Sequence, residues 1–252
     1  MNLLAIETTG RKASVALINQ KGDVYSISSP KELSHLQNLI PMISTLLKER
    51  GLAIEDLSCI AVSQGPGSFT GIRIGMATCK ALAMALQIPV IGVPTLMSFA
   101  WNTPHYQGLI CPVFDARQEQ VYGGAYFWKD GVCLQAVPDG AYAIEDFFNL
   151  ALNSLHKPSK KEIMIFGDGA HVYNERFKDW VNFNEGQKIV YAHEDVNNHK
   201  ASSVARLALE KWNKGQLLTW DELEPVYIRK AEAQRRLEER LLNEKKSNKQ
   251  KE

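Results

Sequence analysis

Alternating apolar positions open the chain, and a helical spacing follows them. Residues 3–7, 13–19 and 23–28 carry strand-like apolar patterns, and a short glycine-containing turn joins the last two segments, so we expect three strands. Apolar residues then recur every three to four positions across 34–50, which predicts a helix packed on the sheet. The next expected elements are a strand at 58–63, a helix at 70–86 and a strand at 90–93.

The second half of the chain repeats this order of elements. Its expected strands lie at 109–115, 120–127, 132–137, 163–167 and 189–191, and its expected helices at 144–154, 172–180 and 202–214. Two copies of a βββαβαβα unit predict an α/β protein with two lobes that meet at a cleft. We expect an N-terminal lobe at 1–104, a C-terminal lobe at 105–228, and a C-terminal helix with a basic polar tail at 229–252.

Composition excludes a protein whose whole surface is built to grip nucleic acid. Lysine and arginine total 29 and aspartate and glutamate 28, which gives a net charge of +1. From residue 229 onward there are nine basic and five acidic residues, so the basic character is confined to the tail. The pattern contains no signal peptide and no apolar run long enough for a membrane helix, and its four cysteines are widely spaced. We therefore expect a cytoplasmic protein with reduced cysteines and no membrane contact.

One polar cluster ends the first strand and has two interpretations. Glu7, Thr8 and Thr9 could form a vestigial nucleotide loop, holding a metal through the carboxylate and phosphate through hydroxyls and amides. They could equally form an ordinary turn with local side-chain hydrogen bonds. Asp115 and Asp168 lie in turn-like segments and could each place a further carboxylate at the cleft or simply end a strand.

The glycine-rich turn before the second predicted helix is the most distinctive segment. It consists of Gly65, Pro66, Gly67, Ser68, Phe69, Thr70 and Gly71. Glycines allow a sharp turn, and a helix N-terminus favours an anion. No Gly-Lys-Ser/Thr follows, however, and the spacing is not that of a dinucleotide-binding loop. We favour a tight loop whose glycines serve packing or a partner over a phosphate site.

The histidines do not suggest a metal or catalytic site. No two of the six are spaced three or four apart on a predicted helix, so we expect no metal and no cofactor. His193 and His199 flank a polar loop and are expected to be solvated. No serine, histidine and aspartate set is nominated by spacing alone, so no catalytic residue is assigned.

The two helices of the first half predict a partner surface. If Leu36, Leu39/Ile40, Ile43 and Leu47 face the sheet, a mixed polar stripe with one methionine faces outward from each helix. The expected outward positions are His35, Asn38, Met42, Thr45 and Glu49 in the first helix and Arg73, Ala77, Lys80, Met84 and Gln87 in the second. Such a mixed surface is typical of an interface that is exposed to water in the free protein and buried in a complex.

In their order, these segments resemble the TsaB (YeaZ) family over about 230 residues. The resemblance is carried by Leu4-Ala5-Ile6-Glu7-Thr8-Thr9, the Ser34-His35 segment through Ile43, Gln64 through Gly75 with its Gly-Pro-Gly-Ser-Phe-Thr-Gly string, Pro89 through Pro94, Asp115-Ala116-Arg117, and Glu224-Pro225-Val226-Tyr227-Ile228-Arg229. Most relatives start with Asp-Thr-Ser where this chain has Glu-Thr-Thr, which weakens any transfer of nucleotide binding to Glu7.

The resemblance implies a two-lobed fold of the actin/Hsp70/sugar-kinase (ribonuclease H-like) type. It also implies a non-catalytic subunit that pairs with the catalytic subunit TsaD, joined by the ATPase TsaE, to form N6-threonylcarbamoyladenosine at position 37 of tRNAs reading ANN codons. The same two helices would serve a homodimer and the TsaD heterodimer in turn, and tRNA would be met through the complex.

Two other functions remain as alternatives. A kinase-like, ATP-using enzyme of the same fold would need two phosphate loops with acidic residues, for which Glu7 and either Asp115 or Asp168 are available. A peptidase would need a nucleophile, a base and a group that orients the base, and the sequence suggests no such set.

Overall fold

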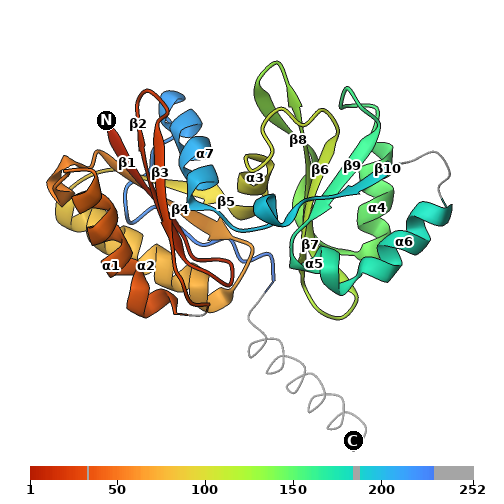
Figure 1. Ribbon diagram of the computed structural model, residues 1–252, viewed down its shortest axis with the longest axis horizontal. Helices are drawn as coiled ribbons and strands as arrows, with labels where there is room; N and C mark the ends of the chain where they lie inside the picture. Colours follow the sequence, from red (N-terminus) through yellow and green to blue (C-terminus); the bar gives the residue numbers. More distant parts are fainter. Residues whose placement is uncertain (33, 184–187, 230–252) are drawn as a thin grey trace, which may run out of the picture.

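Two α/β lobes lie side by side in the computed structural model, which describes residues 1–32, 34–183 and 188–229 (Figure 1). Each lobe is built on a five-stranded mixed sheet, with strand orders β3-β2-β1-β4-β5 and β10-β9-β6-β7-β8. The predicted third unit at 229–252 lies outside the described residues except for Arg229.

The elements follow the predicted order in both halves. The first repeat contains β1 (Asn2–Glu7), β2 (Ser14–Asn19), β3 (Val24–Ser28), α1 (His35–Glu49), β4 (Cys59–Gly65), α2 (Phe69–Leu86), β5 (Val90–Pro94) and α3 (Thr95–Ala100). The second contains β6 (Leu109–Asp115), β7 (Gln120–Lys129), β8 (Val132–Ala143), α4 (Ile144–Asn153), β9 (Glu162–Phe166), α5 (Asp168–Val172), α6 (Asn174–Phe183), β10 (Lys188–Tyr191) and α7 (Ala201–Asn213). In each, the first strand pairs antiparallel with the second and parallel with the fourth, which confirms the duplicated unit.

Three parts of the structure differ from the prediction. Helix α3, Thr95–Ala100, is not among the elements expected from the sequence. Strand β8 continues through Pro138 and Gly140, which indicate a turn in the sequence, because β8 is an edge strand where a missing N–H and a local irregularity are tolerated. The single helix expected at 172–180 is instead divided into α5 and α6.

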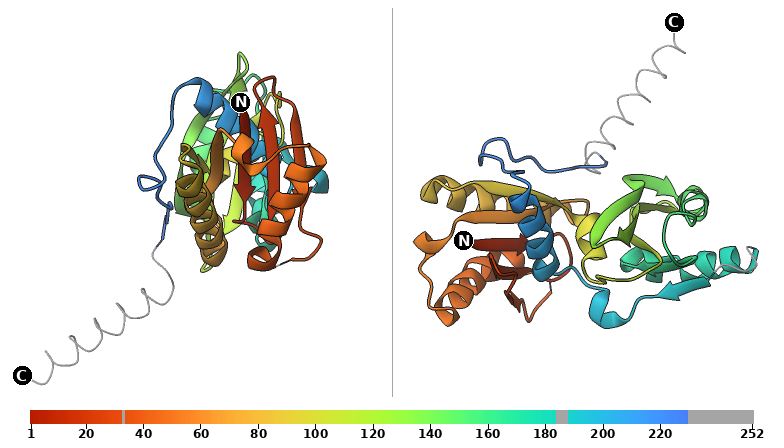
Figure 2. Two further views of the ribbon diagram at one scale, coloured as in Figure 1. Left: turned by 90° about the vertical axis from the view of Figure 1, so that its left-hand side faces the viewer. Right: turned by 90° about the horizontal axis from the view of Figure 1, so that it is seen from above.

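The last helix of each repeat packs on the sheet of the other repeat. Helix α3 contacts β6 and β7, whereas α7 lies along β1, β2 and β5 (Figures 1 and 2). Val204, Ala205 and Ala208 of α7 are buried there, in one cluster with residues of the first sheet. The expected C-terminal lobe at 105–228 is therefore wrong in including α7, since packing rather than chain order decides which lobe a helix joins.

Helix α1 is rotated relative to the predicted orientation. His35 and Met42, expected to face outward, are buried, while Leu36 and Ile40 are 76% and 54% exposed. Apolar residues occupy both sides of this helix, so the sequence pattern allowed two rotations of the helix about its axis, that is, two phases. The imidazole Nε2 of His35 lies 2.9 Å from the carbonyl oxygen of Gly10, and this polar contact fixes the phase that turns His35 inward.

Helix α2 has the predicted inward face. Ile72, Met76, Cys79 and Ala83 are buried against the sheet, and Arg73, Ala77 and Met84 are exposed. Its 18 residues would by length and composition allow a membrane span, but here α2 packs along β4 as one of the core helices of the first lobe. The expected stripe on this helix is thus confirmed in its orientation, with Lys80 half-buried rather than exposed.

Candidate functional site

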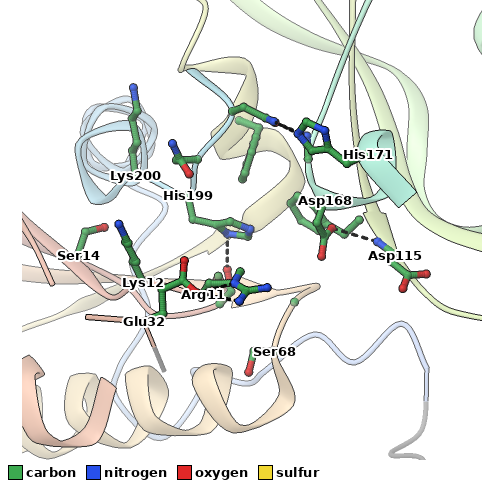
Figure 3. A pocket seen from close by; sticks show the side chains of 18 of the residues that line it. Arg11, Lys12, Ser14, Glu32, Ser68, Asp115, Asp168, His171, His199 and Lys200 are labelled. Carbon is green, nitrogen blue, oxygen red and sulfur yellow. Dashed lines mark hydrogen bonds and ion pairs between the residues drawn. The ribbon is translucent and has the colours of Figure 1, made fainter. Parts of the chain in front are cut away.

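A pocket of about 780 Å³ lies between the lobes (Figure 3). Figure 3 shows Lys12 and Lys200 on one side and Asp115 and Asp168 on the other. The two carboxylates that the sequence could only place in turns therefore both line the cleft. They are held by local hydrogen bonds: Asp168 Oδ1 accepts from the backbone N–H of Asp115 at 3.1 Å, and Asp115 Oδ1 accepts from the hydroxyl of Tyr173 at 2.8 Å. Burial raises the pKa of Tyr173 to about 12, so this donor stays neutral.

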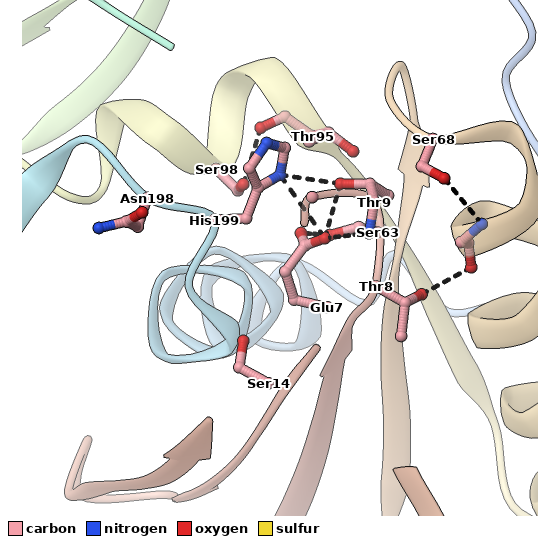
Figure 4. Close-up of polar contacts among 12 residues, drawn as sticks. Glu7, Thr8, Thr9, Ser14, Ser63, Ser68, Thr95, Ser98, Asn198 and His199 are labelled. Atoms are coloured by element: carbon pink, nitrogen blue, oxygen red, sulfur yellow. Dashed lines mark hydrogen bonds and ion pairs between the residues drawn. The ribbon is translucent and has the colours of Figure 1, made fainter. Parts of the chain in front are cut away.

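Beside the pocket, the Glu7 carboxylate is fully buried and is surrounded by protein donors (Figure 4). Its Oε1 accepts hydrogen bonds from the backbone N–H and the hydroxyl of Thr9, both at 2.6 Å, and its Oε2 accepts from the hydroxyl of Ser63. Burial alone raises the pKa of Glu7, but the hydrogen bond and charge attraction of His199 and the hydroxyl donors outweigh burial and lower it. Glu7 is therefore an ionised carboxylate whose two oxygens together accept hydrogen bonds from three protein donors.

His199 completes this cluster, and the sequence analysis missed it. Expected to be solvated, its ring instead lies within the cleft, with Nδ1 at 2.9 Å from Thr9 Oγ1 and 3.7 Å from Glu7 Oε1. His193, its expected companion, is exposed as predicted. His199 lies just before α7, the helix that packs on the first sheet. Its place in the cleft follows from that packing, which the sequence pattern did not predict.

The glycine-rich turn packs on the Glu7–Thr9 segment. A Cβ atom at Gly67 would lie 2.7 Å from the backbone oxygen of Thr9, and one at Gly71 would lie 1.9 Å from that of Thr8. The backbone N–H of Ser68 donates to the Thr9 oxygen at 2.8 Å, and the Thr8 hydroxyl donates to the Gly71 oxygen at 2.8 Å. These glycines therefore serve close backbone packing, which is the interpretation that the sequence favoured.

The C-terminal end of the described chain supports the same turn from outside. The backbone N–H of Val226 donates to the oxygen of Gln64 at 2.8 Å, and the ring of Tyr227 packs on Phe69 with centroids 4.7 Å apart. Arg229 then reaches the second lobe, donating to the oxygen of Ala116 at 2.8 Å. The Glu224–Arg229 motif thus lies along the first lobe and ends on the second.

The vestigial nucleotide loop does not fit a metal-bound phosphate. A metal ion in the pocket would need to reach an oxygen of Glu7, yet that carboxylate is fully buried and both of its oxygens are held by protein donors. The Thr9 hydroxyl lies beside His199 as a nucleophile would, but it is buried and donates its hydrogen to Glu7. In the part of the chain that the structure describes, no group of three or more metal-ligating side chains comes together.

The surface of α1 and α2 is the second candidate site. The two helices cover the same face of the first sheet (Figures 1 and 2). Leu36 and Ile40 of α1 and Met84 of α2, the last 47% exposed, present large apolar side chains to solvent. Exposed Ala77, Ala81 and Ala85 add small side chains on α2 that allow close approach. Of the residues expected at an interface, Asn38 is half-buried and Thr45 and Arg73 are exposed.

Comparison with known proteins agrees with this architecture. A sequence model of the family described as tRNA N6-adenosine threonylcarbamoyltransferase (TsaD) matches residues 29–241. The tRNA threonylcarbamoyladenosine biosynthesis protein TsaB of Bacillus subtilis strain 168 is 32% identical over 234 residues, covering 93% of this chain and 96% of that protein. The protein of the same name from Escherichia coli K12 is 27% identical over 239 residues, covering 94% and 98%.

Solved structures give the same relationship. A Pseudomonas aeruginosa protein described as similar to peptidase YeaZ superposes with a TM-score of 0.76 and 30% identity, covering 90% of this chain and 99% of that one. A second structure, YeaZ from the same species, gives 0.73 and 28%. The duplicated, two-lobed α/β architecture is thus of the actin/Hsp70/sugar-kinase type, as the resemblance implied. Within that class, the chain belongs to the TsaB (YeaZ) family.

Proposed function

We propose that this chain is a cytoplasmic, non-catalytic subunit in the formation of threonylcarbamoyladenosine at position 37 of tRNA. It pairs through the exposed face of α1 and α2 with a TsaD-type catalytic subunit, or with a second copy of itself when that subunit is absent. A TsaE-type ATPase joins the pair, and tRNA is met through the complex. The names of its relatives support the pathway, and the α1–α2 face is the observation that carries the pairing.

This face has the properties of a surface that is covered in a complex. Leu36 is 76% exposed although it belongs to a helix whose other side is fully packed. Ile40 lies one turn from Leu36 on the same side of α1, and neighbouring exposed apolar side chains among polar residues are typical of protein interfaces. Met84 adapts its shape readily, and the alanines of α2 let another helix approach its backbone.

The cleft supports a non-catalytic role. Thr9 and Ser63 both donate hydrogen bonds to Glu7, and the Glu7–Thr9 segment is packed against the glycine-rich turn. A catalytic group must be able to reach a substrate, and these groups are buried within the protein. The chemistry therefore belongs to the partner.

The test is association with the TsaD-type protein of the same genome. Ile40→Glu and Ala77→Arg should each abolish co-purification and self-association, because an unpaired charge buried in an interface costs roughly 3 kcal/mol or more, over a hundredfold in affinity. Val172→Glu, at a position 59% exposed on α5 of the other lobe, is the matched control and should bind as wild type. Wild-type association of both interface variants, measured by light scattering and pull-down, would place the interface elsewhere.

A further inference from the structure

His199 touches both lobes through one ring. It lies in the segment that returns from β10 of the second lobe to α7 on the first, directly before the N-cap residue Lys200. On the side of the first lobe, Nδ1 contacts Thr9 and Glu7 (Figure 4). On the side of the second lobe, the ring stacks on Phe114 of β6, with centroids 4.8 Å apart. Phe99 of α3 packs edge-on against it at 4.7 Å.

The hydrogen-bond pattern fixes the direction of the polar contact. Thr9 has one hydroxyl hydrogen, and it donates that hydrogen to Glu7 Oε1 at 2.6 Å. The 2.9 Å contact between Thr9 Oγ1 and His199 Nδ1 therefore requires a proton on Nδ1, so His199 donates. The imidazole is held at the end of a chain of hydrogen bonds that terminates on a buried carboxylate.

The first lobe also leaves space for this ring. A Cβ atom at Gly10 would lie 2.5 to 2.9 Å from atoms of the His199 side chain. The φ angle of Gly10 is not in the left-handed region, so the backbone conformation does not require glycine there. The missing side chain instead leaves space for the ring of His199. Gly10, Thr9 and Glu7 thus form one binding site for the side chain of His199, which lies in the segment that connects the two lobes.

We propose that His199 is an internal clamp that holds the two lobes in their closed arrangement. In two-lobed proteins that close around a ligand, the ligand contacts both lobes and stabilises the closed state. Here a side chain of the chain itself makes the equivalent contacts, between Glu7 and Thr9 on one side and Phe114 on the other. His199 is a positioning residue, and the proposal involves no residue of the α1–α2 face, so it stands or falls independently of the proposed pairing.

The test removes the clamp by two independent routes. His199→Ala deletes the ring. Gly10→Ala keeps the histidine in the sequence but pushes its ring away from Thr9 and Glu7. Each should accelerate amide hydrogen exchange in residues 7–12, 95–108 and 192–200 by up to about tenfold, the loss expected for one buried hydrogen bond between uncharged groups. Each should also increase the radius of gyration measured by small-angle X-ray scattering. His193→Ala, in the same segment but exposed, is the matched control and should match wild type in both measurements.

The double variant distinguishes the clamp from a general loss of stability. With His199 absent, Gly10→Ala has nothing to displace, so the double variant should behave as His199→Ala alone. His199→Asn keeps a donor near Thr9 but lacks the ring, and it serves if His199→Ala does not fold. Unchanged scattering and exchange in Gly10→Ala would overturn the proposal, as would exchange that rises equally in all parts of the chain or effects of the two substitutions that add.

Discussion

The buried Glu7 carboxylate shows how a costly residue is accommodated. Removing an ionised carboxylate from water is unfavourable unless hydrogen bonds and opposite charge replace the water. Thr9 supplies two donors, its backbone N–H and its hydroxyl, and Ser63 supplies one from β4. His199 in turn donates to the Thr9 hydroxyl oxygen. The sequence could identify Glu7 and Thr9 as a pair, but Ser63 lies 56 positions from Glu7 and His199 lies 190 positions from Thr9, so only the fold brings them together.

Glu7→Gln should weaken the protein and change its response to acid. At pH 7 the amide cannot accept as many hydrogen bonds, which should cost about 1–3 kcal/mol in the free energy of unfolding. Because the pKa of Glu7 is lowered by folding, the carboxylate stabilises the native state above its unfolded pKa of about 4.3. That contribution is lost as pH falls through the lower folded value. The loss of stability below about pH 5 should therefore be smaller in Glu7→Gln, as measured by urea unfolding between pH 7 and pH 3.

Glu32→Gln is the matched control for Glu7. Glu32 pairs with Arg11 at 2.8 Å on the surface, where its side chain is 45% exposed. Exposed ion pairs contribute little, so this substitution should change the free energy of unfolding by less than about 1 kcal/mol. Equal effects of the two substitutions at every pH would mean that Glu7 is no more strongly held than a surface carboxylate.

At the scale of the elements, periodicity predicted the inward face of α2 but not that of α1. In α2 the large apolar residues Ile72 and Met76 share one side with Cys79, and Arg73 lies on the other side, so one orientation of the helix is favoured. In α1 apolar residues occur on both sides, so two phases were comparable, and the contact of His35 with Gly10 decides between them. That second apolar side is itself informative, since it forms the exposed α1–α2 face.

Gly75→Ala should destabilise the protein although it improves the helix propensity of α2. Replacing glycine by alanine in a helix interior normally stabilises the folded protein by about 1 kcal/mol. Here the new Cβ would lie 2.3 Å from Thr8 Oγ1, so α2 must move away from the end of β1. We expect a lower melting temperature by thermal denaturation. Thr8→Ala removes the shortest contact of this Cβ and leaves the one with Val62 Cγ2 at 3.2 Å, so adding Gly75→Ala to that variant should lower the melting temperature less than it does in the wild type; an equal decrease would contradict the assigned packing.

At the scale of the whole molecule, the sequence predicted the repeated unit but not how the halves are connected. Strand and helix order follow from local patterns, and these identify both copies of the unit. Helices α3 and α7 pack on each other's lobes, and Arg229 reaches Ala116 on the second lobe. Each of these contacts joins residues far apart in the chain, which local periodicity does not record. The lobes are therefore joined by exchanged helices and by the end of the chain, as well as by His199.

The contacts that hold Glu7 inside the protein lead to a prediction about nucleotide binding. An ATP-using enzyme with the same fold would be stabilised by Mg-ATP, and a ligand present at a hundred times its dissociation constant adds about 2.7 kcal/mol to the free energy of unfolding. For a chain of this size, that corresponds to a rise of roughly 5–10 °C in melting temperature. Because Glu7 is held by Thr9, Ser63 and His199, we expect no rise above 1–2 °C, about the value that weak binding alone would produce. Thermal denaturation with and without millimolar Mg-ATP measures this, and magnesium with a non-nucleotide polyphosphate controls for general ion effects. A rise of several degrees specific to Mg-ATP would revive the kinase-like alternative and would require the Glu7 cluster to open in solution.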